Sequence, residues 1–535
     1  MCRPFALLIV LAAVAGLAAS AGARRLAPAG PNATFAVTGH GWGHGVGMSQ
    51  YGAYGYAQHG FGYAKILAHY FPGTQLGPAP QAKVRVLLAA GSRTLKLSSP
   101  ADFTVRDGDG DSHDLAAGTY TLTTALKLKF DGGNKAKPLK PPLLFQPGSA
   151  PLQLGRHYRG SIQVDVAGGA LRAVNVVGLE QYLYGVVPSE MPFTWAPEAL
   201  KAQAVVARSY ALATKRSGAF DLYPDTRSQM YLGYDHERPS STVAVDATAG
   251  KVLLYEGQVA KTYFFSTSGG RTASAQDAWG TPIPYLVSVP DPYDSISPYH
   301  TWGPIAFSGA RLGKALRAGG PVRDVRVSVN SSGRVTTMTA LTASGQRSFA
   351  ASALRRLLGL KSTWFTVGVL SLSAPGSALA YGSSTKLSGI VRGVGGVVLE
   401  QRVSGSWQAL GGVKPGGDGS LAVSVAPKVT TVYRLATTKI AAAAARVPVA
   451  PVVRLFTPRT PTELRGTVRP LFAGTPVAIQ RQQGTRWVSV AHAPVDAAGT
   501  FDARLQLVSG TYRARVPAGH GLVAGASALL QVTTS

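Results

Sequence analysis

The sequence predicts an α+β domain rich in antiparallel strands, followed by two all-β sandwiches in tandem. Its 63 glycines and 35 prolines, with many Val and Thr residues, favour sheets and turns over helical bundles. Short runs of alternating apolar and polar residues recur through residues 83–177. The last third of the chain contains an internal repeat with an offset of about 80 residues, the size of a small sandwich. A hydrophobic content of 45% is enough for packed cores.

The first residues have the pattern of an export signal. An uncharged apolar run covers residues 4–23, and its small residues offer cleavage sites. Because about 20 apolar residues can span a bilayer, a retained anchor is the alternative. Arg24 and Arg25 follow on the side that would face outward, which disfavours an anchor. We therefore expect residues 1–23 to be a cleaved signal peptide, and the mature chain to be secreted to the cell envelope without a membrane segment.

Charge and cysteine content restrict the function classes. The chain has 53 Lys and Arg residues against 25 Asp and Glu, a net charge of +28. For an exported protein this charge predicts anionic cell-wall polymers as partners, with phospholipid headgroups as the alternative. The basic residues are dispersed, so no nucleic-acid partner is expected. The single cysteine, Cys2, lies in the predicted signal. The mature chain therefore has no disulfide, no thiolate nucleophile and no Cys-ligated zinc, and we expect no metal or other cofactor.

The most informative segment is residues 39–52, here called the glycine strip, where glycine occupies every second position up to residue 47. A helix is not expected, because each helical glycine costs about 1 kcal/mol. Alternation leaves one backbone face bare for close approach. The other face carries His40, Trp42, His44 and Gln50, a set that suits a polar, ring-shaped ligand such as a sugar. The alternative is a glycine-rich strand packed against a helix, with its histidines hydrogen-bonded.

The elements around the strip follow from local patterns. A helix is predicted over Tyr63–Tyr70, which Pro72 and Gly73 end. The sequence Asp-Gly-Asp-Gly-Asp at residues 107–111 resembles a calcium loop but lacks its central glycine and its bidentate glutamate, so a hairpin turn is predicted. Strands are expected at residues 35–38, 84–86, 103–105, 120–122, 162–166, 174–176, Lys251–Tyr255 and 262–265.

Two helices are predicted farther along, at residues 179–185 and over Pro197–Ala213, which carries its proline and Glu198 in the first turn. Between them lies Glu190, with Val, Pro, Met, Phe and Trp as sequence neighbours. In such company a carboxyl loses hydration and its pKa rises, so that it can act as the general acid that cleaves a glycosidic bond. The alternative is a solvent-exposed loop carboxylate.

The internal repeat covers residues 371–447 and 452–535, which we expect to form immunoglobulin-like sandwiches. Each copy contains one tryptophan, Trp407 or Trp487, which is expected to fill the core of its own sandwich, and residues 441–451 are expected to link the copies. The sandwiches either position the chain on the wall, contact a partner, or act as spacers. The matching pairs are residues 387–392 with 464–469, Gln401 and Arg402 with Gln480 and Arg481, and Tyr433 and Arg434 with Tyr512 and Arg513.

Several long motifs then combine into one resemblance. They are Leu179-Glu-x-Tyr-Leu-x-Gly-Val-Val-Pro-Ser-Glu-Met-Pro192, Glu198-Ala-Leu-Lys-Ala-Gln-Ala-Val-Val-Ala-Arg-Ser-Tyr-Ala-Leu212, Ser266-Thr-Ser-Gly-Gly-Arg-Thr272, Trp279-Gly with Pro284-Tyr-Leu-x-Ser-Val289, Gly41-Trp-Gly-His-Gly-Val-Gly-Met-Ser-Gln-Tyr-Gly-Ala53 and His69-Tyr-Phe-Pro-Gly-Thr74. Together, across residues 35–367, they resemble the stage II sporulation protein D / LytB amidase-enhancer family.

The resemblance implies a peptidoglycan lytic transglycosylase domain at residues 33–370, acting on glycan strands, with Glu190 as its catalytic glutamate. It implies that Glu190 protonates the oxygen leaving C1 of N-acetylmuramic acid and then takes the proton of the C6 hydroxyl as a 1,6-anhydro ring closes. The sugar supplies its own nucleophile, so a second carboxylate is unnecessary. The residues expected to bind substrate are His40, Trp42, His44, Gln50, Gln203, Arg208, Tyr210, Ser266 and Ser268. For Gln203, Arg208 and Tyr210, helix packing is the alternative role.

The chain departs from the family pattern in two places. The glycine strip ends the domain in the familiar order but comes first here, as in a circular permutation. Permutation is tolerated where chain ends lie close together, so residues 35–39 and 363–367 are predicted to be adjacent. Phe265 stands where many relatives have His, and the cysteines with which some relatives bind zinc are absent from the mature chain.

Two other functions remain open at the level of the sequence. The first is a non-enzymatic wall-binding protein that activates a cell-wall amidase, which would then be a partner. The second is a zinc amidase built on His40, His44 and His69. For His40 and His44, sugar binding or a structural role is expected in preference to metal binding.

Overall fold

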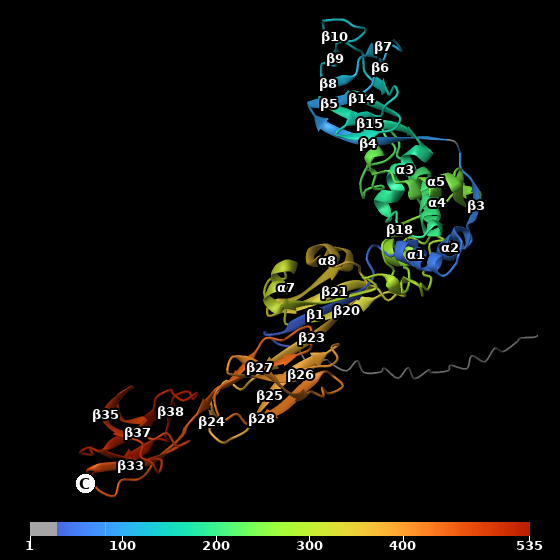
Figure 1. Ribbon diagram of the computed structural model, residues 1–535. Coiled ribbons are helices and arrows are strands. Elements are labelled where there is room, and N and C mark those ends of the chain that lie inside the picture. Colours follow the sequence, from blue (N-terminus) through green and yellow to red (C-terminus); the bar gives the residue numbers. More distant parts are fainter. Residues whose placement is uncertain (1–28, 81, 535) are drawn as a thin grey trace, which may run out of the picture. The chain divides into compact units, whose positions relative to one another are not determined.

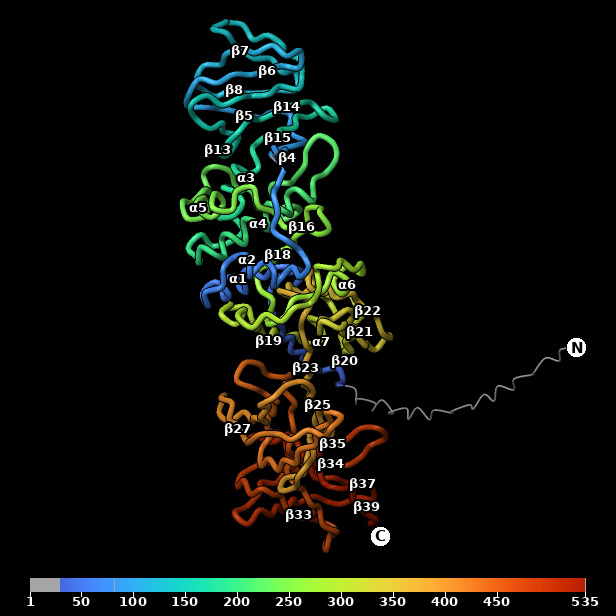
Figure 2. Tube along the Cα trace, turned by 90° about the vertical axis from the view of Figure 1, so that its right-hand side faces the viewer, coloured from blue at the N-terminus to red at the C-terminus, as the bar shows by residue number. Residues whose placement is uncertain are grey.

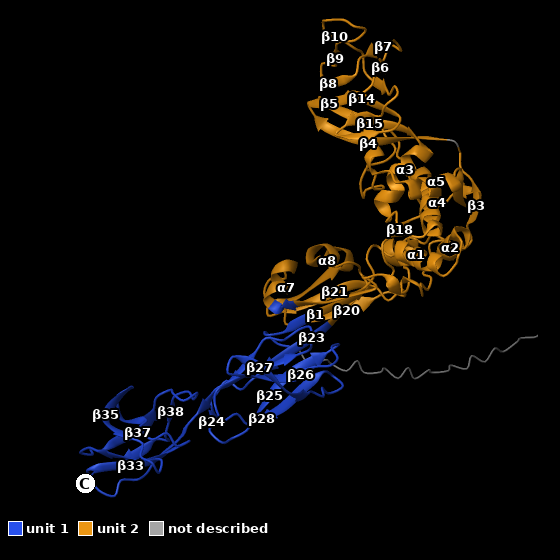
Figure 3. Cartoon of the chain, viewed as in Figure 1, with its two compact units in different colours: residues 1–35, 307–309, 368–535 blue, residues 36–306, 310–367 orange. Residues whose placement is uncertain are grey.

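The computed structural model describes residues 29–80 and 82–534, so the predicted signal peptide lies outside the described residues. The chain forms two compact units (Figure 3). The larger unit comprises residues 36–306 and 310–367, and the C-terminal unit comprises residues 368–534 with 29–35 and 307–309. Strands predominate over helices, as expected (Figure 1). Within the described ranges, no helix is long and apolar enough to cross a membrane.

The helices of the larger unit gather around α4 (Pro197–Ala213), which has the bounds predicted from the sequence. Its alanines, except Ala213 at the C-terminal end, are buried and let neighbouring backbones approach closely. The elements that pack on α4 are α1 (Gln50–Gln58), α2 (Tyr63–Tyr70), α3 (Leu179–Glu190), α5 (Pro239–Ala247) and β16 (Lys251–Tyr255). The remaining helical segments are η1 (Tyr234–His236), α6 (Ala275–Trp279), η2 (Asp294–Ile296), α7 (Gly309–Leu316) and α8 (Ala351–Leu358).

Two antiparallel sheets make up the strand-rich part of the larger unit, where the predicted strands are confirmed. A six-stranded sheet has the order β4-β15-β14-β11-β6-β7, and a four-stranded sheet the order β13-β12-β5-β8. Their strands are β4 (Lys83–Ser92), β5 (Thr94–Ser99), β6 (Phe103–Arg106), β7 (Ser112–Leu115), β8 (Gly118–Thr123), β11 (Leu143–Gln146), β12 (Leu152–Leu154), β13 (Arg156–Tyr158), β14 (Ser161–Ala167) and β15 (Ala170–Gly178), with β9 (Lys127–Leu128) and β10 (Lys137–Pro138) as a separate pair.

The acidic segment at residues 107–111 is the hairpin turn that the sequence predicts, since it joins the paired strands β6 and β7. Asp107 Oδ1 accepts hydrogen bonds from the backbone amides of Asp109, Gly110 and Asp111. The carboxylate is therefore used by the turn itself.

Short strands bring distant segments of the larger unit together. β2 (Met48–Ser49), at the end of the glycine strip, pairs in parallel with β18 (Phe264–Phe265). β18 lies next to α1 and α2 (Figure 2). At the start of the strip, the His40 amide donates to the Trp364 carbonyl at 2.8 Å, and Thr366 Oγ1 donates to the Thr38 carbonyl at 3.4 Å. The predicted adjacency of residues 35–39 and 363–367 is thereby confirmed. The other strands of this part are β1 (Thr34–His40), β3 (Gln75–Pro78), β17 (Gln258–Val259), β19 (Thr301–Ser308), β20 (Asp324–Val329), β21 (Val335–Thr342) and β22 (Gly345–Ala350).

The C-terminal unit builds one strand arrangement twice, in agreement with the repeat in the sequence. In the first copy β25 (Thr385–Arg392) pairs with β23 (Phe365–Ser373) and β28 (Ser420–Val425), and in the second β33 (Glu463–Arg469) pairs with its own two neighbours. A second sheet accompanies each, in the orders β27-β26-β29-β30 and β35-β34-β37-β38. In the second copy both sheets contribute to one core. The immunoglobulin-like topology stays a prediction.

The remaining strands of this unit are β24 (Leu379–Ala380), β26 (Val398–Val403), β27 (Ser406–Gly412), β29 (Thr431–Ala436), β30 (Ala445–Val447), β31 (Val449–Ala450), β32 (Val452–Leu455), β34 (Pro476–Gln483), β35 (Arg486–Pro494), β36 (Thr500–Arg504), β37 (Gly510–Val516), β38 (Gly525–Ala526) and β39 (Leu530–Val532). Residues 441–451 are therefore not a bare linker, because β30 and β31 lie within them.

The expectation that the repeat tryptophans fill the cores is wrong. Trp407 is only half-buried, and the Arg434 guanidinium lies 4.0 Å from its ring centroid. Trp487 is placed in the same way, with Arg513 at 4.1 Å. A guanidinium stacked on an indole makes a cation–π contact and shields the apolar ring from water, while the guanidinium itself stays hydrated. The indole can therefore stay at the surface of the sandwich without exposing its whole apolar area.

Candidate active site

Glu190 belongs to a helix and not to a loop. α3 (Leu179–Glu190) continues past the predicted end at Gly185, so the expectation of a short helix is wrong. Val187 and Pro188 are buried in the core, and this burial keeps the chain helical beyond the glycine. Pro188 lies in the last turn, where its missing N–H removes one backbone hydrogen bond and the helix can end soon after.

The carboxyl of Glu190 is half-buried and held on one side only. Its Oε1 accepts a hydrogen bond of 2.6 Å from the Met230 backbone amide. No described residue hydrogen-bonds to Oε2, which is therefore free to meet a ligand. Burial raises the pKa of Glu190 to about 6, against the hydrogen bond from Met230, which lowers it. Both protonation states are thus accessible near neutral pH.

The glycine strip is tied to Glu190 through Gln50. The Gln50 side-chain amide, at the start of α1, donates to the Glu190 carbonyl at 2.9 Å and to Gln203 Oε1 at 3.4 Å. All three residues come from different helices, α1, α3 and α4. Gln50 and Gln203 are buried, so they position the end of α3 and do not contact solvent in the cleft.

A cleft of about 450 Å³ opens beside Glu190. It joins the first half of the glycine strip, the end of α3, one face of α4 and the segment around β18. Most of its wall is aromatic, and Glu190 is the only acidic residue among the described residues that line it. The lining residues are Trp42, Gly43, His44, Glu190, Tyr210, Thr226, Ser228, Tyr263, Phe264, Phe265, Ser266, Trp279 and Arg355.

His44 is held as a neutral ring. The Val46 amide donates to Nδ1 at 3.1 Å, so the proton resides on Nε2, which donates to the Phe264 carbonyl at 3.1 Å. Burial lowers the pKa of His44 to about 4. Both ring nitrogens are used by the backbone, and in the described ranges no three His, Cys, Asp or Glu side chains gather as a metal site would require.

The strip is an irregular loop, so the expected extended ribbon with all four side chains on one face is wrong. Gly41, Gly43, Gly45 and Gly47 have φ values of 72°, 126°, 88° and 80°, which only glycine adopts without strain. A Cβ on Gly43 would lie 2.7 Å from the Cβ of Phe265. The backbone is therefore approached closely, as expected, but its turns point successive side chains in different directions.

The last residues of the strip also differ from expectation, because α1 begins at Gln50 and includes Gly52 and Gly55. A Cβ on Gly52 would collide with Tyr70 Oη and the Asp291 carboxylate. Close packing of the helix on these groups outweighs the entropic cost of helical glycine.

Five of the ten predicted site residues line the cleft, namely Trp42, His44, Glu190, Tyr210 and Ser266. Trp42 is 40% exposed and stands edge-on to Tyr299, with ring centroids 4.5 Å apart. Gln50 and Gln203 lie behind Glu190. The other three predicted residues lie elsewhere and are corrected below.

His40, Arg208 and Ser268 do not reach the cleft. His40 packs on Trp364, with ring centroids 4.9 Å apart. Arg208 is fully buried and donates to both carboxylate oxygens of Glu180. Ser268 is fully buried, and its Oγ accepts from the Gly270 amide at 3.0 Å. The polar groups of Arg208 and Ser268 are thus used inside the protein, whereas His40 Nδ1 is buried without a hydrogen-bond partner. None of the three side chains lines the cleft.

Some lining residues were missed by sequence reasoning. Tyr263 and Phe264 lie three and two residues before Ser266, and the density of aromatic residues there was a usable signal. The sequence around Thr226, Ser228 and Arg355 does not indicate that they line the cleft. A loop brings the first two there, and the distant helix α8 brings Arg355.

A buried acidic pair supports the turn that follows Ser266. Asp294 accepts hydrogen bonds from Ser49 Oγ at 2.9 Å and from the Ser268 and Gly269 amides, each at 2.8 Å. Asp291 accepts from Tyr70 Oη at 2.8 Å. Burial, with the neighbouring Asp294 charge, raises the pKa of Asp291 to about 7.

The Asp291→Asn variant is expected to lose less stability at alkaline pH than the wild type. The folded chain holds the Asp291 proton more tightly than the unfolded chain does, so protonation of Asp291 stabilises the fold. This contribution to the free energy of unfolding is complete below about pH 4 and is lost as pH rises through about 7. The loss amounts to roughly 4 kcal/mol. Urea unfolding at several pH values between 4 and 8 measures it, with the exposed Asp225→Asn as control. Equal pH slopes for wild type and Asp291→Asn would contradict the assignment.

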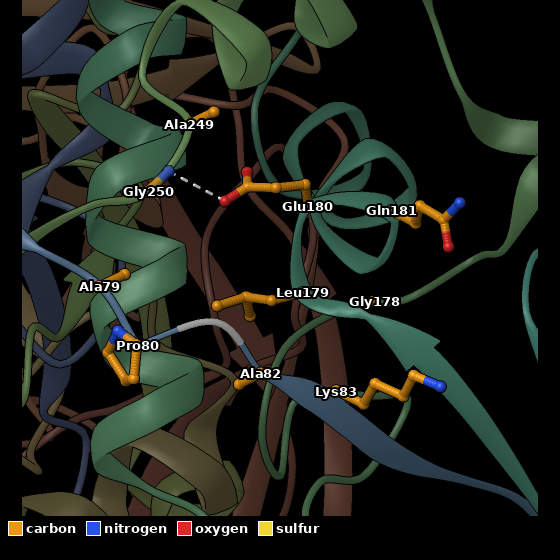
Figure 4. A pocket seen from close by; sticks show the side chains of 10 residues that line it. All are labelled: Ala79, Pro80, Ala82, Lys83, Gly178, Leu179, Glu180, Gln181, Ala249 and Gly250. Carbon is orange, nitrogen blue, oxygen red and sulfur yellow. Dashed lines mark hydrogen bonds between the residues drawn. The ribbon is translucent and has the colours of Figure 1, made fainter.

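Another cavity, of about 590 Å³, lies beside Glu180 (Figure 4). The Glu180 side chain points toward the Gly250 amide, which donates to its Oε1 at 3.1 Å (Figure 4). Its Oε2 accepts from Arg208 Nη2 at 2.6 Å. Both oxygens are occupied by a cation and a backbone amide, so this carboxylate anchors α3 and α4 and is poorly placed to exchange a proton with a ligand.

Comparison with known proteins finds a family match in the region that contains Glu190. Residues 167–255 match the family model SpoIID, described as stage II sporulation protein. Over 155 residues the chain is 37% identical to stage II sporulation protein D of Bacillus subtilis, covering 26% of this chain and 45% of that protein. Over 113 residues it is 40% identical to the amidase enhancer of Bacillus subtilis, covering 21% of this chain and 15% of that protein. The chain spans less than half the length of these relatives.

Among solved structures, a titin fragment covers 31% of this chain and 95% of its own length, with 12% identity and a TM-score of 0.16. Similarity at this level carries no argument about the C-terminal repeats.

Proposed function

We propose, from the match of residues 167–255 to the stage II sporulation protein D family model and from the similarity to its relatives, that the chain is an exported peptidoglycan lytic transglycosylase. It cleaves the bond between N-acetylmuramic acid and N-acetylglucosamine and forms a 1,6-anhydro ring on the muramic sugar. The observation that supports the proposal best is Glu190, a half-buried carboxyl with a pKa of about 6 that opens onto an aromatic cleft.

The acidic content of the cleft favours this reaction over hydrolysis. Glycosidases that use water place two carboxyl groups about 5–10 Å apart across the bond. Glu190 is the only acidic residue among the described residues that line this cleft. A reaction whose nucleophile belongs to the sugar needs one carboxyl that first donates and then accepts a proton.

The two proton transfers use the free oxygen of Glu190. Protonated Glu190 donates from Oε2 to the glycosidic oxygen, whose bond to C1 of N-acetylmuramic acid breaks. The resulting carboxylate takes the proton of the C6 hydroxyl while O6 bonds to C1, which restores the acid. Throughout, the Met230 amide holds Oε1 and Gln50 holds the Glu190 backbone, so that the carboxyl keeps its position.

The aromatic wall suits the sugar rings on either side of that bond. Trp42, Tyr263 and Trp279 line the cleft together with Tyr210. Aromatic faces bind the apolar faces of sugars, and the hydroxyls of tyrosine provide hydrogen bonds at the ring edges. The net charge of +28 suits an envelope rich in anionic polymers.

The rate of cleavage is expected to fall above about pH 6. The free enzyme must enter the reaction with Glu190 protonated, and the protonated fraction drops about tenfold per pH unit above the pKa. Initial rates of anhydromuramyl product formation between pH 5 and 8, with circular dichroism to verify folding at each pH, measure kcat/KM. A kcat/KM that stays constant up to pH 8 would contradict the role of Glu190 as general acid.

The similarity to an amidase enhancer makes activation of a cell-wall amidase the second candidate. Purified protein is incubated with peptidoglycan glycan strands freed of stem peptides, and the soluble products are analysed by mass spectrometry. Anhydromuramyl products support the enzyme. Binding to the strands without such products, together with faster stem-peptide release by an added amidase, supports the activator.

A further inference from the structure

A second cavity, of about 330 Å³, adjoins the cleft and contains two arginines. It shares His44, Trp279 and Arg355 with the cleft, and it is also lined by Arg334. We call it the arginine cavity. A group bound in it therefore lies next to whatever occupies the cleft beside Glu190.

Arg334 is buried in the wall of the arginine cavity, and not all of its N–H donors have hydrogen-bond partners. Its side chain is 3% exposed, and its Nε has no hydrogen-bond partner. Nη2 donates to the Arg271 carbonyl at 3.0 Å, and the guanidinium packs on the Trp364 ring, 5.1 Å from its centroid, and on the backbone of Gly45. Burial lowers the pKa of Arg334 to about 10, so it still carries its charge at neutral pH.

Arg355 adds a second positive charge from α8. It is half-buried and lines both the cleft and the arginine cavity. Within residues 29–80 and 82–534, neither Arg334 nor Arg355 has an ion-pair partner. Asp277 is the acidic lining residue, and its carboxylate already accepts hydrogen bonds from the Ser331 and Ser332 hydroxyls.

Two partly dehydrated guanidiniums face one carboxylate, that of Asp277, whose hydroxyl donors keep it ionised, so the cavity has excess positive charge. Guanidinium groups bind carboxylates in bidentate fashion, and such charge-assisted bonds are the stronger ones in proteins. We propose that the arginine cavity is a subsite for a carboxylate carried by the muramic sugar of the glycan substrate. The inference rests on the proposed function for the identity of that substrate.

The carboxylate has two chemical sources. In peptide-free strands each N-acetylmuramic acid carries a lactyl carboxylate on O3. In peptide-bearing strands the lactyl group is an amide, and carboxylates occur on the stem peptide. N-Acetylglucosamine has neither, so oligomers of this sugar alone give the reference affinity.

Binding by isothermal titration calorimetry tests the proposal on the full chain carrying Glu190→Gln, which prevents turnover. The ligands are a peptide-free muramyl tetrasaccharide, the same tetrasaccharide with stem peptides, and chitotetraose. The peptide-free ligand is expected to bind about 10- to 100-fold more tightly than chitotetraose. Adding Arg355→Ala should abolish this difference, Arg355→Lys should restore part of it, and the exposed neighbour Arg356→Ala should leave it intact.

A gain that depends on Arg355 and occurs only with the peptide-bearing ligand would assign the carboxylate to the stem peptide. An unchanged affinity ratio in a folded Arg355→Ala variant would overturn the proposal. The outcome is separable from the function itself. If the protein binds carboxylate-bearing ligands selectively but the wild type forms no anhydro products, the subsite is supported and the enzymatic function is contradicted. If the wild type forms products but binding shows no carboxylate selectivity, the enzymatic function is supported and the subsite is contradicted.

Discussion

Replacement of Glu190 by Gln is expected to lower the rate of anhydromuramyl product formation by about 100- to 10,000-fold. This is the usual contribution of a positioned general acid and base. Here one residue performs both transfers, so the loss should lie toward the upper end. The glutamine side chain can still accept the Met230 hydrogen bond through its amide oxygen, and the end of α3 should keep its place. Muropeptide mass spectrometry over a time course measures the rate.

The matched control is Glu198→Gln, which changes a carboxylate on α4 outside the cleft. Glu198 pairs with Lys201 at 2.6 Å and accepts from the Tyr63 amide, so its replacement should leave the rate within a few-fold of wild type. If Glu190→Gln retains more than about a tenth of the wild-type rate while folded, Glu190 is not the acid. The amidase-activator function would then be the better account of the cleft.

Replacement of Arg208 by Ala is expected to lower the free energy of unfolding by about 3–5 kcal/mol. Arg208 is fully buried in α4 and donates to both oxygens of Glu180 and to the carbonyls of Lys251 and Val245. Removal of the fully buried Arg208 leaves the Glu180 carboxylate, whose side chain is 30% exposed, without its cation, and the shortened side chain leaves a cavity. Urea denaturation of the full chain, with hydrogen exchange of α4 amides, measures the loss.

The control for this variant is Arg216→Ala, an exposed arginine beyond the end of α4. Its replacement should change stability by less than about 1 kcal/mol. Arg208→Met should lie between wild type and Ala, because it fills the space without the charge. If Arg208→Ala instead keeps wild-type stability and weakens glycan binding, the side chain must turn toward the ligand, as the sequence resemblance first implied.

The sequence alone predicted those features that depend on interactions between residues a few positions apart. The helices Tyr63–Tyr70 and Pro197–Ala213 have the predicted bounds because proline, glycine and helical spacing act within a few residues. The hairpin at residues 107–111 was predictable for the same reason. The apolar sequence neighbours of Glu190 correctly indicated a raised pKa, although only the family resemblance singled it out as the catalytic residue. The glycines of the strip correctly indicated close backbone approach.

Which side chains meet in the cleft depends on contacts between distant segments, and no local pattern carries that information. Arg208 and Tyr210 are two positions apart on α4, so they point to different faces, and because α4 is buried nearly all round its sequence cannot show which face meets the cleft. Arg355 comes to line the same cavity as His44 only because α8 folds against distant segments of the larger unit. Glu190 is the last residue of helix α3 because the burial of Val187 keeps the chain helical beyond Gly185. Local sequence thus decides where elements begin and which residues can do chemistry, whereas packing across the chain decides which of them share one cavity.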